Sequence, residues 1–281
     1  MPQSETDIQA KFIDHGLGDY WSRFIDQIQP CIAVEYETCF DNAVAVGKSK
    51  LGGKPDLPRQ VEWAVFNETP LTFLAQINLS QLPHSAISSL FPQKGILSFF
   101  FSLSNDDYAS SPHKVLFSDT SDGSLERKEP PARWDSKETI YKTGLITFDI
   151  KQSLPSCESE SVSDIFEQDA EKWRAYLQLS EPENPNGTTN RIMGHPSHSS
   201  GNYELICECI SIGDNNLEFL PKFSDSQKDN IRDKWLLLLQ IDSNVDLDMY
   251  MGVDLDCFYF WIKKDDLANK DFSKTVAFSF H

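Results

Sequence analysis

Two cysteines and two histidines lie close enough in the sequence to suggest a zinc site. Cys207 and Cys209 stand two residues apart, and His195 and His198 shortly precede them. Thiolates and imidazoles are the ligands that zinc prefers in structural sites. Paired zinc thiols, however, usually sit on a tight C-x-x-C turn, whereas the alternating residues 204–210 are typical of a strand. We expect a strand with two buried thiols there, and the zinc site stays an alternative.

Two loops carry part of a ligand-binding motif. Residues 47–54 space their glycines as in a phosphate loop, but Gly53 stands where the lysine belongs, and Pro55 replaces the Ser or Thr that would hold magnesium. Residues 242–248 alternate oxygen ligands like the start of a calcium loop, but Leu247 occupies the glycine position. We therefore expect no nucleotide, no metal and no cofactor.

The chain lacks the G-x-S-x-G elbow that presents a nucleophile on a strained turn. We accordingly expect no catalytic residue. A competing hypothesis is an enzyme of unknown reaction with a site around Arg191, His195, His198 and Asp254. A further alternative is a purely structural interaction domain.

Two glutamines occupy similar places in the sequence. Gln76 and Gln240 each follow largely apolar, strand-like residues and precede an isoleucine. A primary amide both donates and accepts hydrogen bonds, so it can pair with a peptide backbone whatever the side chains are. Each glutamine could bind an extended polypeptide in this way. The alternative is that each bonds a neighbouring loop of its own half.

Helices and strands must position these residues. Apolar residues at helical spacing predict one or two helices within residues 4–28 and another over 165–177. Segments that alternate or are continuously apolar predict strands. The predicted strands are 31–36, 71–79, 95–102, 113–117, 145–150, 235–242 and 258–262. The Gly- and Pro-rich residues 49–58 predict a shaped loop without a regular element.

Three features recur in the same order in the two parts of the chain. A Gly/Pro loop, an apolar strand ending in Gln-Ile and an aromatic strand occur at residues 50–101. A similar loop, strand and aromatic strand occur at residues 191–262. Such ordered recurrence predicts an internal duplication.

These patterns predict an α+β fold with a mainly antiparallel sheet, internally duplicated, with N-terminal and middle helices. We expect one compact domain whose parts are an N-terminal helical segment, a first β-rich half, a helical join and a second β-rich half. Their predicted bounds are 1–30, 31–150, 151–190 and 191–281.

The same motifs resemble those of the YwqG-like family of bacterial proteins. The matching segments are 49–58 with Trp63, 71–79 with Gln76, 235–242 with Gln240, and 259–267 with Trp261. The family usually carries Trp-Gly-Asp-x-Gly before the aromatic strand, where this chain has Gly-Val-Asp-Leu-Asp at 252–256. The resemblance implies a duplicated α+β fold. It also implies polypeptide binding, because such proteins are similar to a domain of eukaryotic ribosomal-protein chaperones and occur among candidate toxin-immunity proteins.

Charge limits the choice of partner. The chain has 43 acidic and 25 basic side chains and a net charge of −18. Phosphate recognition depends on Lys and Arg, so we expect neither nucleic acid nor an anionic membrane as partner. Residues 236–260 contain five aspartates and no Lys or Arg, which favours a basic protein or peptide. Net charge that serves only solubility is the alternative.

The leading hypothesis is therefore a non-enzymatic, chaperone-like or immunity-like module. It would hold a basic or extended polypeptide with its acidic second half and the groove between its halves. The candidate binding residues are Trp63, Gln76, Gln240, Asp242, Asp246, Asp248, Asp254 and Trp261. We expect a cytoplasmic protein, because the six cysteines are scattered and the longest apolar stretch is far short of a membrane span.

Overall fold

A computed structural model of the chain describes residues 5–102, 110–119, 125–131, 140–166, 169–180, 187–197, 202–251 and 257–279. His198, Asp254 and Asp256, which the sequence analysis singled out, lie outside the described residues. All structural statements below concern the described part of the chain.

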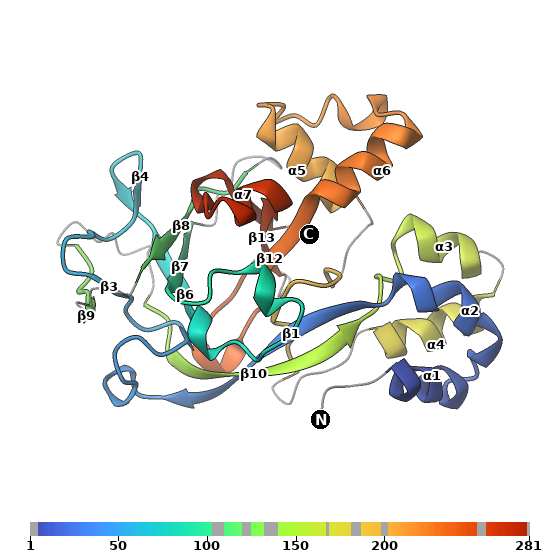
Figure 1. Cartoon of the computed structure of the whole chain (residues 1–281), viewed down its shortest axis with the longest axis horizontal. Helices are drawn as coiled ribbons and strands as arrows, with labels where there is room; N and C mark the ends of the chain where they lie inside the picture. The colour runs from blue at the N-terminus through green and yellow to red at the C-terminus, as the bar shows by residue number, and fades with distance from the viewer. Residues whose placement is uncertain are drawn as a thin grey trace.

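A ten-stranded antiparallel sheet forms the body of the molecule (Figure 1). Its strands are β1 (Gln29–Cys39), β2 (Lys50–Leu51), β6 (Thr72–Asn78), β7 (Ile96–Phe101), β8 (His113–Ser118), β10 (Thr143–Ser153), β11 (Arg191–Ile192), β12 (Trp235–Ile241), β13 (Phe258–Lys263) and β14 (Val276–Ser279). Their order across the sheet is β14-β13-β12-β11-β1-β10-β2-β6-β7-β8. The expected α+β fold with a mainly antiparallel sheet is confirmed.

The sheet curls until its two ends approach each other. The backbone N–H of Ser111, just before β8, donates to the carbonyl of Ala277 in β14 at 3.0 Å. Inside the curl, Phe99 of β7 contacts Phe260 of β13, with ring centroids 5.1 Å apart. The nearly closed sheet therefore surrounds a continuous apolar core, to which alternate residues of each aromatic strand contribute.

Each side of the sheet repeats one arrangement outwards from the central β1–β10 pair. A two-residue strand is followed by a seven-residue strand and then by an aromatic strand, as β2-β6-β7 on one side and β11-β12-β13 on the other. In register, Lys50 pairs with Gln76 and Arg191 pairs with Gln240. An internal duplication would produce this correspondence, and the duplication itself stays a prediction.

The Gly/Pro-rich segment is more regular than expected. Besides β2 it contains β3 (Asp56–Pro58), which pairs with β9 (Leu125–Arg127). The segment turns at Gly52 and Gly53, whose φ angles are +60° and +68°. A Cβ on Gly53 would lie 2.2 Å from the Asp41 carboxylate, so only glycine fits this turn. The prediction of an entirely irregular loop was wrong because backbone pairing with distant residues creates these short strands.

N-terminal and middle helices pack together at one end of the sheet (Figure 1). They are α1 (Glu5–Asp14), α2 (Trp21–Phe24), α3 (Glu160–Phe166) and α4 (Ala170–Ser180). Phe24 stacks on Tyr176 with ring centroids 4.6 Å apart, and the Tyr176 hydroxyl donates to the Pro155 carbonyl at 2.9 Å. The helices predicted within residues 4–28 are confirmed, whereas the single helix predicted over 165–177 corresponds to parts of two helices, α3 and α4. We call this group of four helices the helical unit.

Three further helices lie beside the C-terminal strands β12–β14 (Figure 1). They are α5 (Tyr203–Ser211), α6 (Asp225–Lys234) and α7 (Lys264–Ala268). The strand predicted over residues 204–210 is wrong, because this segment is part of α5. Tyr203, Cys207 and Ile210 also have the spacing of one face of a helix. This helix face packs against β12–β14, and that packing favours the helix over the predicted strand.

Short elements complete the described chain. The two-residue strands β4 (Val65–Phe66) and β5 (Thr69–Pro70) form a small hairpin. Single 3-10 turns lie at Gly18–Tyr20, Ile25–Gln27, Asp41–Ala43, Leu79–Gln81, Ser88–Leu90, Leu220–Lys222, Val245–Leu247 and Phe272–Lys274. Across the described residues, no helix combines the length and the apolar composition that a bilayer span requires.

Candidate functional site

The two glutamines hold loops of their own halves. Both side chains are completely buried. Gln76 accepts from the backbone N–H of Asp56 at 2.8 Å and donates to the carbonyl of Lys48 at 2.7 Å. The alternative interpretation of these glutamines, bonding within their own half, is confirmed here.

Gln240 makes the matching pair of hydrogen bonds in the second half. It accepts from the backbone N–H of Ser197 at 2.9 Å and donates to the carbonyl of Thr189 at 2.9 Å. Because these amides already pair with backbone groups inside the fold, we assign Gln76 and Gln240 a structural role and not contact with a partner.

A buried ionic cluster adjoins Gln76. Lys50 lies 2.7 Å from Asp41, and Arg127 lies 2.9 Å from the fully buried Asp56. Burial alone would raise the pKa of Asp56, but hydrogen bonds from Arg127 and from the Gly47 N–H together hold it below its usual value. Burial lowers the pKa of Lys50, although Asp41 counteracts this effect. Every charge in the cluster therefore has a partner, as a buried structural network requires.

Arg191 stands in register where Lys50 stands in the first half, and it braces a loop. Its guanidinium donates to the His195 carbonyl at 2.9 Å, to the Ser197 hydroxyl at 2.8 Å and to the Thr189 carbonyl at 3.2 Å. Within the described chain it forms no ion pair with a carboxylate. The proposed enzyme site around Arg191, His195 and Asp254 thus has its arginine engaged in holding the backbone.

The predicted aspartates lie near the end of β12. Asp242 accepts from the backbone N–H of Thr189 at 2.8 Å, and Asp248 pairs with Lys142 at 2.9 Å. Asp246 is exposed. Burial, helped by the charges of Asp246 and Asp242, raises the pKa of Tyr36 to about 12. Asp242 is therefore engaged inside the fold and Asp248 forms an exposed ion pair, whereas Asp246 is exposed without an ion pair among the described residues.

The two predicted tryptophans differ in their hydrogen bonding. Trp63 is buried, and its indole N–H donates to the Leu71 carbonyl at 2.7 Å. Trp261 is only 2% exposed, and its indole N–H has no hydrogen-bond partner among the described residues. A buried donor without an acceptor carries a desolvation cost of about 1–3 kcal/mol. Of the two, Trp261 is the one beside an open space.

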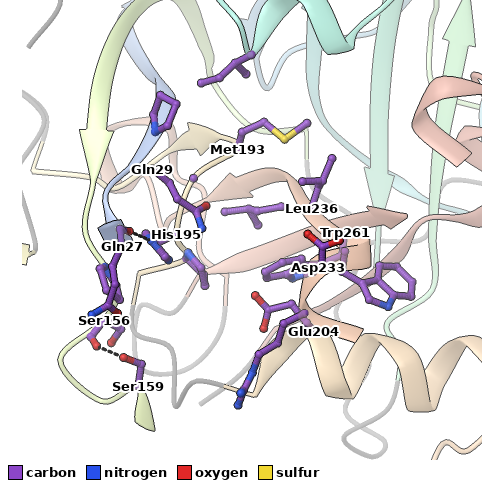
Figure 2. Close-up of a pocket in the computed structure, with 18 of the residues that line it drawn as sticks. Gln27, Gln29, Ser156, Ser159, Met193, His195, Glu204, Asp233, Leu236 and Trp261 are labelled. Carbon is purple, nitrogen blue, oxygen red and sulfur yellow. Dashed lines mark hydrogen bonds between the residues drawn. The ribbon is translucent and has the colours of Figure 1, made fainter. Parts of the chain in front are cut away.

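That space is a cavity of about 470 Å³ between the helical unit and the second half of the chain (Figure 2). One wall comes from the residues around Gln27 and Ser156, and another from the loop 193–196. The remaining wall includes Glu204 of α5, Asp233 of α6 and Trp261 of β13. Its volume is in the range of small-molecule and peptide side-chain pockets.

His195 lines one side of this cavity, and a hydrogen bond defines its tautomer. Its Nε2–H donates to the Gln27 carbonyl at 2.6 Å, a bond drawn in Figure 2. Burial is the main cause that lowers the pKa of His195 to about 4, and the nearby Arg191 adds to it. The imidazole is therefore neutral at pH 7, which leaves Nδ1 as an unprotonated acceptor.

Cys207 and Cys209 are both buried, as expected, but they lie on a helix and not on a strand. On a helix, residues two apart point in different directions, so the thiols do not share a face. Burial raises the pKa of Cys207 well above its usual value and that of Cys209 to about 11. No cluster of three His, Cys, Asp or Glu side chains that could hold a metal ion occurs in the described ranges, and His198 lies outside them.

Acidification should weaken the fold through His195. The unfolded chain binds a proton near pH 6.5, whereas the folded protein does so only near pH 4, so stability falls as pH drops between these values. We expect a loss of roughly 2 kcal/mol between pH 7 and pH 5 from this residue. Urea unfolding of the wild type and of His195→Gln at both pH values measures it. Equal losses in the two proteins would contradict this assignment.

Sequence reasoning missed Glu204 and Asp233 as cavity residues. Glu204 was assigned to a strand, and Asp233 belongs to a polar helix without any motif. The helical spacing of Tyr203, Cys207 and Ile210 was the one local signal that could have placed Glu204 on a helix. The cavity itself joins residues as distant as Gln27 and Lys264, which no spacing in the sequence links.

The fold and the cavity define an α+β domain with a nearly closed antiparallel sheet and a lateral cavity. Residues 49–279 match the family model described as Domain of unknown function (DUF1963). The chain belongs to this family. No curated protein matches the chain.

Proposed function

We propose that this protein is a polypeptide-binding module of the YwqG-like type, whose cavity receives part of a basic or extended polypeptide. The YwqG-like proteins are members of the matched family, and a chaperone-like or immunity-like role follows from that resemblance. Neither nucleic acid nor a membrane is part of this proposal. A cytoplasmic location is part of it, supported by six cysteines that are all free thiols.

The composition of the cavity wall is the observation that carries this proposal. About half of the lining residues are apolar or aromatic and the others are polar or charged, a mixed composition like that of protein–protein interfaces. The apolar lining consists of Pro30, Ile87, Leu90, Pro155, Met193, Pro196, Trp235, Leu236, Leu237 and Trp261. The charged lining residues are Glu204, Arg232, Asp233 and Lys264. Asp233 is paired with Lys264 and Arg232 lies 3.9 Å from Asp229, so Glu204 is the carboxyl that favours a basic partner.

No specific observation favours the enzyme alternative. A nucleophilic site needs an activated side chain within hydrogen-bond reach of a base. Among the described cavity residues, Ser159 donates to the Ser156 carbonyl at 2.8 Å, and His195 donates to Gln27. These bonds organise the wall and do not couple a nucleophile to a base.

Filling the cavity should abolish peptide binding. Gln29 is exposed at the start of β1 and lines the cavity, so Gln29→Trp adds bulk there without disturbing the core. We expect the wild type to bind a subset of immobilised peptides of varied net charge, and Gln29→Trp to lose at least about tenfold in affinity. Dissociation constants from fluorescence anisotropy of the bound peptides measure this.

Thr38→Trp is the matched control, because Thr38 is exposed in the same strand but away from the cavity. It should bind the peptides like the wild type. Wild-type binding that Gln29→Trp leaves unchanged would rule out the cavity as the site. A wild type that retains no peptide of any charge would overturn the proposed function.

A further inference from the structure

Glu204 is the cavity carboxyl without a close cationic partner. It lies in the first turn of α5, and no lysine or arginine nitrogen of the described residues is within salt-bridge distance. Burial raises its pKa, and Arg232 acts against this from a longer range. Two nearby acids are different, because Asp233 pairs with Lys264 at 2.7 Å and Glu208 pairs with Lys263 at 2.9 Å. Glu204 is thus set apart from its neighbours.

The same wall carries the indole donor without an acceptor. Trp261 packs edge-on against Tyr203, the residue before Glu204, with ring centroids 6.4 Å apart. The indole N–H of Trp235 donates to Glu208 at 2.9 Å, and that of Trp63 donates to Leu71, so the lack of a partner is particular to Trp261 among these three. Glu204, which has no close cationic partner, thus follows a residue that contacts Trp261 directly.

The other charged groups of the cavity do not neutralise Glu204 closely. His195 is neutral, Lys264 is paired with Asp233, and Arg232 lies 3.9 Å from Asp229 on its own helix. Tryptophan rings attract cations through their negative faces. The ring of Trp235 already has the Lys263 ammonium 4.9 Å from its centroid, and Trp261 also lines the cavity. Together with the chain's net charge of −18, this wall suits a positively charged group.

We propose that the cavity seats a lysine or arginine side chain of the bound polypeptide, with Glu204 as its counter-ion. This inference rests on the proposed polypeptide-binding function and specifies the chemistry that the site selects.

The test compares Glu204→Gln with Asp233→Asn on paired peptides. Each basic peptide that the wild type binds is synthesised again with its lysines replaced by norleucine and its arginines by citrulline. We expect the wild type to bind the basic version about tenfold more tightly, and Glu204→Gln to lose this preference. Asp233→Asn removes an acid that already has a partner, so it should retain the preference.

The outcomes separate this inference from the proposed function. If the wild type binds basic and neutral versions equally, or if Glu204→Gln discriminates like the wild type, the basic side-chain inference is overturned while peptide binding stands. If the wild type binds neither version, the proposed function fails and this inference fails with it. Circular dichroism and the urea unfolding midpoint of Glu204→Gln establish that its fold is intact before binding is compared.

Discussion

Replacing Asp56 by alanine should lower the free energy of unfolding by about 3–5 kcal/mol. The carboxylate is fully buried and accepts hydrogen bonds from the Arg127 guanidinium, from the Gly47 N–H and from Gln76, at 2.9, 2.9 and 2.8 Å. Its removal leaves the positive charge of Arg127 facing a carboxylate-sized gap and leaves a buried N–H without an acceptor. Equilibrium urea unfolding at pH 7 measures the change.

Glu126→Ala is the control for this prediction. Glu126 neighbours Arg127 in β9 and pairs with Lys128 at 2.7 Å, but its side chain is 41% exposed. Exposed ion pairs contribute little, so we expect a change within about 1 kcal/mol. If Asp56→Ala lowered the free energy of unfolding no more than Glu126→Ala, the buried ionic cluster would not be a main source of stability in the first half.

Gln240→Leu should lower the free energy of unfolding by about 2–4 kcal/mol. Leucine is similar in shape to glutamine and fills the same space, so the change removes mainly the hydrogen bonds. The substitution leaves the backbone N–H of Ser197 and the carbonyl of Thr189 without their buried partner. Each orphaned group costs about 1–3 kcal/mol. We expect Gln76→Leu to have a comparable effect, because Gln76 makes the same two kinds of bond with Asp56 and Lys48. The shift in urea midpoint at constant m-value reports both.

Gln29→Leu is the matched control, since Gln29 is an exposed strand glutamine whose replacement should change stability by less than about 0.5 kcal/mol. The experiment also decides between the two interpretations of the glutamines. Amides that contacted a partner would be replaced with little loss of stability and a large loss of peptide binding. Stability loss at both positions supports the structural role assigned above.

The matched bonds also bear on how the two halves work. In the first half, the loop after β2 is held by Gln76 and by a complete ionic cluster. In the second half, the corresponding loop is held by Gln240 and Arg191, and it forms a wall of the cavity. The same scaffold thus supports a closed polar core on one side and an open cavity on the other. The proposed binding function uses this difference.

The acidic residues illustrate a limit of charge counting. The sequence singles out the aspartates near the end of β12, yet Asp242 is engaged with Thr189 and Asp248 with Lys142. The carboxyl that lacks a close partner beside the cavity is Glu204, in a segment that the pattern favoured as a strand. Net charge predicts the sign of a partner, but burial and pairing decide which carboxyl meets it.

The amino-acid sequence by itself determined the fold class, seven of the ten strands of the sheet, the helices of the N-terminal and middle segments, and the matched places of Gln76 and Gln240. These features follow from local periodicity and from short motifs, which each segment carries within itself. Only the tertiary structure decided that β2, β11 and β14 join the sheet, that residues 203–211 form a helix, that both glutamines are buried under loops that they bond, and that a cavity opens beside Trp261. These depend on contacts such as Asp56 with Arg127, 71 residues apart, and Gln27 with His195, 168 residues apart. The spacing of residues along the chain does not predict such contacts, because they form only when the sheet curls and its helices pack against it.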